Sequence, residues 1–466
     1  MQVQLIPSAR RLIRSLRDIG YEFVDAVADI IDNSIEAEAT VIGVSLQFEG
    51  EDSYLTIADN GVGMSSKDIQ EALRFGSKGH YRDVDDLGRY GLGLKTASLS
   101  QCERLTVSSR RSELQARINS FCWDLDHIET TNRWEILGVH SEDLKDEVWQ
   151  HLHQSTGTVV TWERLGRLLG YKYPSGEYAR RQVEQMSQSL KLHLGMVFHR
   201  FLSGEVHGKR IAIYVNDERV SPWDPYSRGE AKTQRLDQFY LPIDFNDETF
   251  NVRIQPYILP PQSLYSSVKA HLQASGPSKW NKQQGLYIYR SNRIIQAGGW
   301  GGLRTNDEHT KLLRVAVFIP SQLDELFQVN VAKKHLALPR EFRSELMKEI
   351  QPMVQLAQEV YREKMINLAS SDMSGTSEKF TEAEPRHKIV PKLEPSELHP
   401  TGRLGEAART NKALKTVDSL IERASSKAGL GSNDARVHRL MSALFENADS
   451  LEKKALQSML ERYLAG

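Results

Sequence analysis

The sequence predicts two mixed α/β domains in tandem, followed by a linker and a helical tail. The length of 466 residues allows about three units at roughly 150 residues per domain. Apolar residues make up 39% and charged residues 26% of the chain, which is the usage of globular proteins rather than of fibrous or disordered ones. Segments with helical spacing and β-rich segments occur together up to about residue 345.

Charge and cysteine content exclude several classes of protein. Lys and Arg number 60 against 61 Asp and Glu, so the formal charge of -1 provides no global field for nucleic acid or an anionic membrane. Cys102 and Cys122 are too few for a disulfide scaffold and lack the paired spacing of a zinc site. No apolar run reaches the roughly 18 residues of a membrane-spanning helix. We therefore expect a cytoplasmic protein.

The first domain is expected over residues 1–168 and combines helices with short strands. Residues 8–38 have apolar side chains at helical spacing on both sides of a break near Gly20, which predicts two helices. A further helix is expected at 66–75, ahead of a long polar, glycine-bearing stretch at 76–93. The predicted strands of this domain are residues 40–48, 53–58, 105–108, 114–118 and 158–162.

The second domain is expected over residues 169–345 and begins with a helix at 177–201. Its predicted strands are residues 211–215, 252–256, 286–289 and 314–319. Residues 346–402 are expected to form a helix and then a Pro-rich linker. Residues 403–466 contain two amphipathic helices, which cannot bury much apolar surface alone and therefore indicate a partner protein or a second copy.

Asp29 and Asn33 stand four residues apart on the second predicted helix, so they lie side by side on one face. A carboxamide oxygen is a suitable Mg²⁺ ligand when phosphate oxygens and waters supply the rest, and a carboxylate can take a proton from an attacking water. Asp25, Asp32 and Glu36 share that side, so a solvated polar face is the alternative interpretation.

A polar loop follows the second predicted strand, with Asp59 at the strand end and Gly61 and Gly63 behind it. Glycines there would let the flat ring of a ligand approach the backbone, and a half-buried carboxylate could accept a hydrogen bond from an exocyclic amine. The alternative is an ordinary Asp-Asn-Gly turn.

The glycine-bearing stretch ends in a segment that opens a helix, residues 88–98. Glycines at a helix start expose backbone amides at the positive end of the dipole, which suits phosphate oxygens, and Lys95 adds a cation. The segment is not a P-loop, because Leu94 separates Gly93 from Lys95.

These three motifs occur in an order that resembles the Bergerat-fold ATPases, which include the DNA gyrase B subunit, the large heat-shock chaperone, mismatch-repair MutL and the MORC proteins. The resemblance is strongest to MORC proteins and their bacterial histidine-kinase-like ATPase relatives, through residues 28–37 and 88–95. It covers residues 1–345 approximately and implies an α+β two-layer sandwich followed by a transducer-like domain.

The resemblance also implies roles for individual residues. Asn33 corresponds to the Mg²⁺-binding asparagine and Asp29 to the general base, although most relatives have Glu at that position. Asp59 corresponds to the aspartate that contacts the adenine amino group. The remaining residues of the implied ATP site are Gly61, Gly63 and Met64 beside the base, Gly88, Gly91, Leu92, Gly93 and Lys95 in the phosphate-binding lid, and Thr158 in the later Gly-Thr motif.

The transducer-like domain implies a lysine that reaches the γ-phosphate from a loop after a late strand. The segment 327–334 resembles that loop, and either Lys333 or Lys334 fits, with Lys333 favoured. From the residues alone, a solvated pair of lysines is the alternative.

The expected function is Mg²⁺-dependent ATP binding and hydrolysis, in which ATP orders the lid and favours pairing of two ATPase domains as a homodimer. The family implies DNA as a partner. Asp29 is one methylene shorter than the Glu of most relatives, which keeps a second hypothesis open. In this hypothesis the protein is a slow or non-hydrolysing ATP-controlled switch that presents its helical tail to a protein partner. A phosphotransfer kinase fits less well, because no helical His followed by Glu or Asp suggests a phosphoacceptor.

Overall fold

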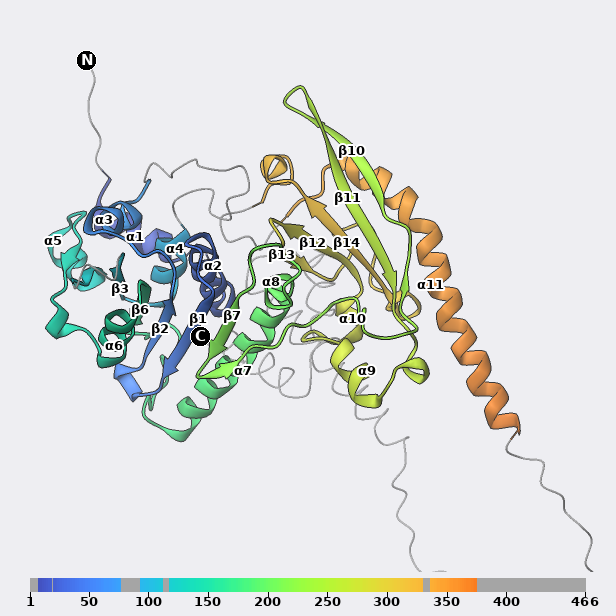
Figure 1. Ribbon diagram of the computed structural model, residues 1–466, viewed down its shortest axis with the longest axis horizontal. Helices are drawn as coiled ribbons and strands as arrows, with labels where there is room; N and C mark the ends of the chain where they lie inside the picture. Colours follow the sequence, from blue (N-terminus) through green and yellow to red (C-terminus); the bar gives the residue numbers. More distant parts are fainter. Residues whose placement is uncertain (1–6, 19, 77–92, 112–116, 330–335, 375–466) are drawn as a thin grey trace, which may run out of the picture. The chain divides into compact units, whose positions relative to one another are not determined.

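The computed structural model describes residues 7–18, 20–76, 93–111, 117–329 and 336–374. All of them fall within the first of the two compact units of the chain, and Figure 1 shows their helices and strands as a coloured ribbon. The tail at 403–466 lies outside the described residues. Two β-sheets with separate hydrophobic cores divide the described chain into a first and a second domain.

The first domain is built on an eight-stranded sheet in the described part of the chain, with the order β5-β4-β3-β6-β2-β1-β7-β8. Adjacent strands are antiparallel except β1 and β7, which are parallel. The strands are β1 (Val41–Gln47), β2 (Tyr54–Asp59), β3 (Arg104–Arg110), β4 (Asn119–Asp124), β5 (Leu137–Gly138), β6 (Gly157–Glu163), β7 (Ala212–Val215) and β8 (Glu218–Arg219). The fold class predicted for this part is therefore confirmed, since helices and a largely antiparallel sheet form two layers.

Alternation along the strands sends successive side chains to opposite faces of this sheet. Ile57 and Val160 lie in the main core, whereas Ala58 and Val159 join a small cluster on α6 (Asp146–Gln154). The main core holds α1 (Ala9–Arg17), α2 (Phe23–Glu36), α4 (Gly93–Gln101) and α7 (Glu177–Val197). The predicted helix pair at 8–38 and its break near Gly20 are confirmed.

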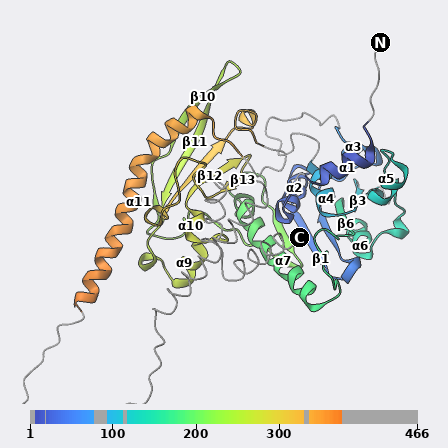
Figure 2. The same cartoon turned by 180° about the vertical axis from the view of Figure 1, so that it is seen from behind.

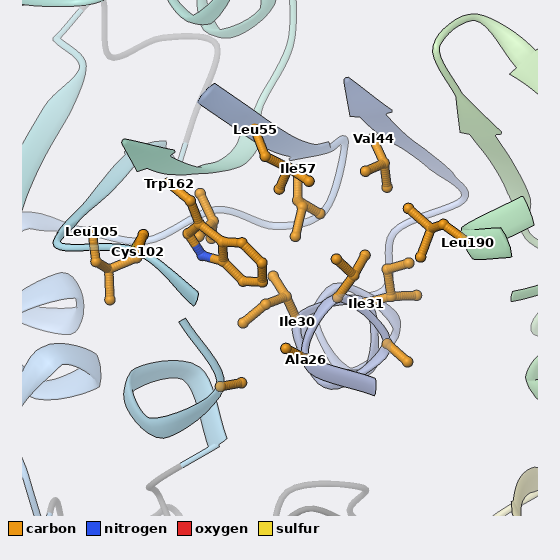
Figure 3. Packing of buried hydrophobic residues seen from close by; sticks show 14 of the residues in the cluster. Ala26, Ile30, Ile31, Val44, Leu55, Ile57, Cys102, Leu105, Trp162 and Leu190 are labelled. Atoms are coloured by element: carbon orange, nitrogen blue, oxygen red, sulfur yellow. The ribbon is translucent and has the colours of Figure 1, made fainter. Parts of the chain in front are cut away.

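Helix α2 lies against the middle of the sheet. Its Ala26, Ile30 and Ile31 point toward Leu55 and Ile57 of β2 in Figure 3. These side chains are almost completely buried, and burying each stabilises the fold by roughly 1 to 3 kcal/mol. The position of α2 is therefore fixed by its apolar side, which also fixes where its polar residues lie.

The hydrophobic core of the first domain includes residues beyond 168. Residues from α7, α8 (His199–Leu202) and β7 belong to the first core, which ends at Val220, and the second core begins at Tyr226. The sequence predicts the boundary between domains at 168/169 and places the strand at 211–215 in the second domain. Strand β7 pairs instead with β1, because its buried Ile213 and Val215 complete the first sheet.

The second domain has a sheet of order β10-β11-β14-β12-β13, with β9 paired to β11. Its strands are β9 (Gln234–Arg235), β10 (Phe239–Phe245), β11 (Glu248–Ile258), β12 (Gly285–Arg290), β13 (Arg293–Ala297) and β14 (Leu313–Ile319), and its helices are α9 (Val268–Ala274), α10 (Lys279–Gln283) and α11 (Arg340–Ser374). Phe342, Leu346 and Ile350 of α11 enter the core of this domain, and the helix runs beside β10 and β11 (Figure 2). Pro352 lies inside α11.

Strands β4, β5, β8, β9, β10 and β13 were not predicted from the sequence, and of the strand predicted at 114–118, residues 117–118 lie outside any strand and 114–116 lie outside the described residues. Strand β10 alternates exposed polar and buried apolar residues over only seven positions, and β13 is five residues long. No helix among the described residues has the length and apolarity to cross a membrane.

A buried polar chain joins α8 to the second sheet. The Nε2 atom of His199 lies 2.8 Å from the hydroxyl oxygen of Tyr289, which lies 2.8 Å from that of Tyr226. Burial lowers the pKa of His199 to about 4, against the opposing influence of the Asp224 and Glu205 carboxylates. The folded protein therefore holds this imidazole neutral at neutral pH.

This burial predicts a pH dependence of stability. An unfolded histidine takes up a proton as the pH falls below about 6.5, whereas folded His199 does so only near pH 4. The unfolding free energy therefore falls by about 1.4 kcal/mol for each unit by which the pH falls between these two values. In urea unfolding at a series of pH values, the wild type should lose about 2 to 3 kcal/mol more than His199→Gln between pH 6.5 and about pH 4.5. Equal losses in the two proteins would contradict the assignment.

Candidate functional site

Asp59 ends β2 and lies buried where three segments meet, with 4% of its surface exposed. Its Oδ2 atom accepts a hydrogen bond of 2.9 Å from the hydroxyl of Ser34 on α2. Its Oδ1 atom accepts hydrogen bonds from the backbone N–H groups of Gly61, at 2.9 Å, and Thr158, at 3.2 Å. Burial raises the pKa of Asp59 despite these hydrogen bonds. The Asp59 carboxylate therefore links α2, the loop after β2 and the start of β6 through hydrogen bonds.

The glycines around Asp59 are required by the close approach of neighbouring backbone. A Cβ atom on Gly61 would lie 2.5 Å from the carbonyl oxygen of Ala37, and one on Gly63 would lie 2.2 Å from that of Arg110. Gly157 has φ +136°, and a Cβ there would lie 1.9 Å from the carbonyl oxygen of Asp59. Sequence reasoning attributed Gly61 and Gly63 to the approach of a ligand, whereas the structure adds a packing reason at both positions.

A hydroxyl network holds the loop after β2 against the sheet. The backbone N–H of Met64 donates to Ser109 Oγ at 2.7 Å, and that hydroxyl donates to the carbonyl of Gly157 at 2.7 Å. Ser109 Oγ also lies 3.0 Å from Oγ1 of Thr158. Met64 is half-buried against the first core. The structure thus brings Asp59, Met64 and Thr158 together, as expected for one site.

Sequence reasoning missed Ser34, Ser109 and His151. The Nε2 atom of His151 on α6 lies 3.0 Å from the backbone carbonyl of Asp59, although the sequence favours an ordinary helix surface there. Serine and histidine are common in any chain, so only the fold distinguishes these three. The adjacency of Ser34 to Asn33 was the one available signal.

Asp29 lies on the same helix, about one turn before Asn33, and is 3% exposed. Its Oδ2 atom accepts a hydrogen bond of 3.0 Å from the hydroxyl of Tyr21. Its Oδ1 atom accepts one of 2.9 Å from the guanidinium of Arg293, which lies on β13 of the second domain and also donates to Asp32. Burial opposes the charge of Arg293, but the Asp32 and Asp29 carboxylates raise its pKa overall.

Asn33 is half-buried, and among the described residues none hydrogen-bonds its side chain. The next residue, Ser34, bonds to Asp59, and Asp29 lies about one turn before Asn33 on the same helix. The arrangement offers a carboxamide oxygen and two carboxylates beside the sheet end.

The predicted phosphate-binding segment is described only in part. Helix α4 begins at Gly93, while Gly88, Gly91 and Leu92 lie outside the described residues, as do Lys333 and Lys334. Lys95 is 1% exposed, and its Nζ donates to the carbonyl oxygen of Ala72 at 2.7 Å. Burial lowers the pKa of Lys95 to about 8. In this conformation the ammonium is held by a backbone carbonyl at the end of α3 (Ser66–Leu73).

Residues 21–158 match the family model of the histidine kinase-, DNA gyrase B-, and HSP90-like ATPases. The matched segment runs from α2 to the start of β6 and includes Asp29, Asn33 and Asp59. The first domain is therefore similar to the ATPase domains of this family over these residues, and its fold agrees with the class predicted from the sequence.

Curated relatives of the chain are DNA mismatch repair proteins MutL. The protein from Crocosphaera subtropica is 26% identical over 237 residues, which cover 49% of this chain and 37% of that protein. The protein from Fervidobacterium nodosum is 30% identical over 122 residues, covering 25% and 21%. The protein from Kosmotoga olearia is 29% identical over 87 residues, covering 18% and 14%. The chain thus spans 37% or less of the length of these relatives.

Proposed function

We propose that this chain is a Mg²⁺-dependent ATPase whose first domain binds ATP between α2 and the loop after β2. The observation that carries the proposal is the buried carboxylate of Asp59, which α2, the glycine loop and β6 hold in place within an ATPase-family domain. A carboxylate offers about four acceptor positions, and three are used here. The fourth would accept the exocyclic amine of adenine, with Gly61, Gly63, Met64 and Thr158 beside the base.

Asn33 is proposed as the protein ligand of Mg²⁺. Its half-buried carboxamide has no partner among described residues, which fits a cation that also binds phosphate oxygens and water. In the described ranges no group of three or more His, Cys, Asp or Glu residues has the geometry of a metal site, so the protein would supply few ligands. A bound Mg²⁺ ion would neutralise phosphate charge.

Asp29 is proposed as the general base that takes a proton from the attacking water. Tyr21 and Arg293 hydrogen-bond its two carboxylate oxygens, and a carboxylate oriented in this way can take a proton from a water molecule beside it. The proposed phosphate contacts come from Gly88, Gly91, Leu92, Gly93 and Lys95, and from Lys333 or Lys334. For Lys95 this role requires its ammonium to leave the carbonyl of Ala72.

The wider role is proposed from the names of the relatives. The curated relatives are named as DNA mismatch repair proteins, which favours a DNA-associated clamp or remodeller working as a nucleotide-dependent homodimer. A MORC-like relationship is proposed on residues 28–37 and 88–95 alone. A slow ATP-controlled switch, presenting its tail to a protein partner, is the alternative, and Asp29 in place of the Glu of most relatives favours it.

Replacing Asp59 tests the adenine contact. Asp59→Ala removes a buried acceptor worth about 1 to 3 kcal/mol, so the dissociation constant for ATP should rise about ten- to a hundredfold in isothermal titration calorimetry. Asp124→Ala is the matched control, because Asp124 also ends a strand and accepts backbone N–H groups, from Asp126 and His127. Unchanged affinity in Asp59→Ala would refute the adenine assignment.

Replacing Asp29 tests the hydrolytic step. Asp29→Asn should keep ATP binding but reduce steady-state phosphate release about 10²- to 10⁴-fold, as loss of a general base does. Asp25→Asn is the control, since Asp25 lies one turn earlier on α2 and pairs with His193 at 3.3 Å. If Asp29→Asn turns over like the wild type, another group activates the water. If the wild type binds ATP without measurable turnover, the switch hypothesis is supported.

Nucleotide-dependent pairing is tested by light scattering of the full chain without nucleotide, with ADP and with a nonhydrolysable ATP analogue. We expect the mass to double with the analogue alone, because ATP shifts the population only as far as it binds the closed state more tightly. Adding duplex DNA to each sample tests the proposed partner. An identical mass in every sample would exclude both pairing and DNA binding.

A further inference from the structure

Arg293 enters the proposed ATP site from the second domain at a fixed position. It is the first residue of β13 and follows a two-residue turn, Ser291 and Asn292, in which both residues have positive φ. This is the conformation of a tight hairpin turn between β12 and β13. Arg200 of α8 donates to Asn292 Oδ1 at 2.5 Å and thereby anchors the turn. The backbone that carries Arg293 is therefore held from both sides.

The guanidinium of Arg293 is buried with the carboxylates of α2. Its Nη1 atom donates to Oδ1 of Asp29 and to Oδ2 of Asp32, and its Cζ atom lies 5.8 Å from the ring centroid of Phe198. Both carboxylates and the guanidinium are at most 4% exposed. Charges this deeply buried are stable only when paired, so removing the cation affects both carboxylates.

The second oxygen of the Asp29 carboxylate is held from the opposite direction. Tyr21 donates to Oδ2 of Asp29, and the Tyr21 hydroxyl is itself hydrogen-bonded by the side chain of Thr96. The amide of Gln101 fixes the backbone carbonyl of Tyr21 at 3.1 Å. Thr96 and Gln101 belong to α4, which begins at Gly93. Asp29 therefore connects the helix after the proposed phosphate segment with the hairpin of the second domain.

A second buried arginine of this hairpin pairs with an aspartate of its own domain. Arg290 is paired with Arg293 across the β12–β13 hairpin, and its guanidinium binds Asp324 at 2.8 Å with both side chains at most 5% exposed. That ion pair lies within the second domain. Arg293 differs because its carboxylate partners belong to the first domain and one of them is the proposed base.

We infer that Arg293 is a positioning residue for hydrolysis, which aims the Asp29 carboxylate at the attacking water and makes turnover depend on the seating of the second domain. The inference rests on the proposed function. Tyr21 and Arg293 each fix one carboxylate oxygen, so the side chain is held in one rotamer without contact between Arg293 and the nucleotide. A general base oriented by a third group works only in that orientation, and a displacement of about 1 Å can cost about a hundredfold in rate.

The test compares Arg293→Gln, Arg293→Lys and the matched control Arg290→Gln in the full chain, using ATP affinity, single-turnover hydrolysis and thermal stability. Arg293→Gln should hydrolyse ATP about 10- to 100-fold more slowly with affinity changed by less than about threefold. Arg293→Lys should recover part of the rate, because it keeps a cation beside Asp29 and Asp32. Arg290→Gln should lose stability but hydrolyse ATP like the wild type.

A double-mutant cycle separates positioning from general destabilisation. In an Asp29→Asn background, Arg293→Gln should reduce the rate no further, because the group that it positions is absent. Rate losses that multiply, or wild-type turnover in Arg293→Gln, would overturn the inference and leave the proposed function intact. If Arg293→Gln does not fold, Arg293→Lys replaces it in the cycle, and rate losses that multiply with Asp29→Asn overturn the inference equally. A wild type that neither binds nor hydrolyses ATP would overturn both proposals.

Discussion

The structure depends on the burial of one helix that is apolar on one side and acidic on the other. Ala26, Ile30 and Ile31 fix α2 against the sheet, and their burial carries Asp29 and Asp32 out of water with them. Carboxylates in that environment require paired donors. Tyr21 and Arg293 supply them, and Arg293 comes from the second domain. The packing of a hydrophobic face therefore imposes an electrostatic connection between the two domains.

The requirement that a buried carboxylate be paired with hydrogen-bond donors also explains the other end of α2. Asp59 is buried at the end of β2 and is satisfied by one side-chain and two backbone donors, which come from α2, the following loop and β6. Because neighbouring backbone comes close enough to make these bonds, there is no space for a Cβ atom at Gly61 or Gly157. The glycines, the carboxylate and Ser34 thus form one packing arrangement, and the proposed adenine contact uses what remains of its acceptor capacity.

The sequence anticipated those features that depend on local spacing. Asp29 and Asn33 are one helical turn apart, and Asp59 directly precedes a glycine loop, so their proximity to a helix face and a strand end could be predicted. Arg293 could not be predicted, because 264 residues separate it from Asp29. The pairing of β7 with β1 could not be predicted for a similar reason, because about 170 residues separate the two strands.

The sequence by itself determined the class of fold, the helix and loop that carry Asp29, Asn33 and Asp59, and the resemblance to ATPases that the family match then supported. These depend on helical period, alternation and short motifs, which are properties of neighbouring residues. Only the tertiary structure decided that Asp29 is held by Tyr21 and Arg293, that Ser34 holds Asp59 and that Lys95 binds the carbonyl of Ala72. Such contacts follow from how buried surfaces meet, and the order of residues along the chain does not specify which distant polar groups must then pair.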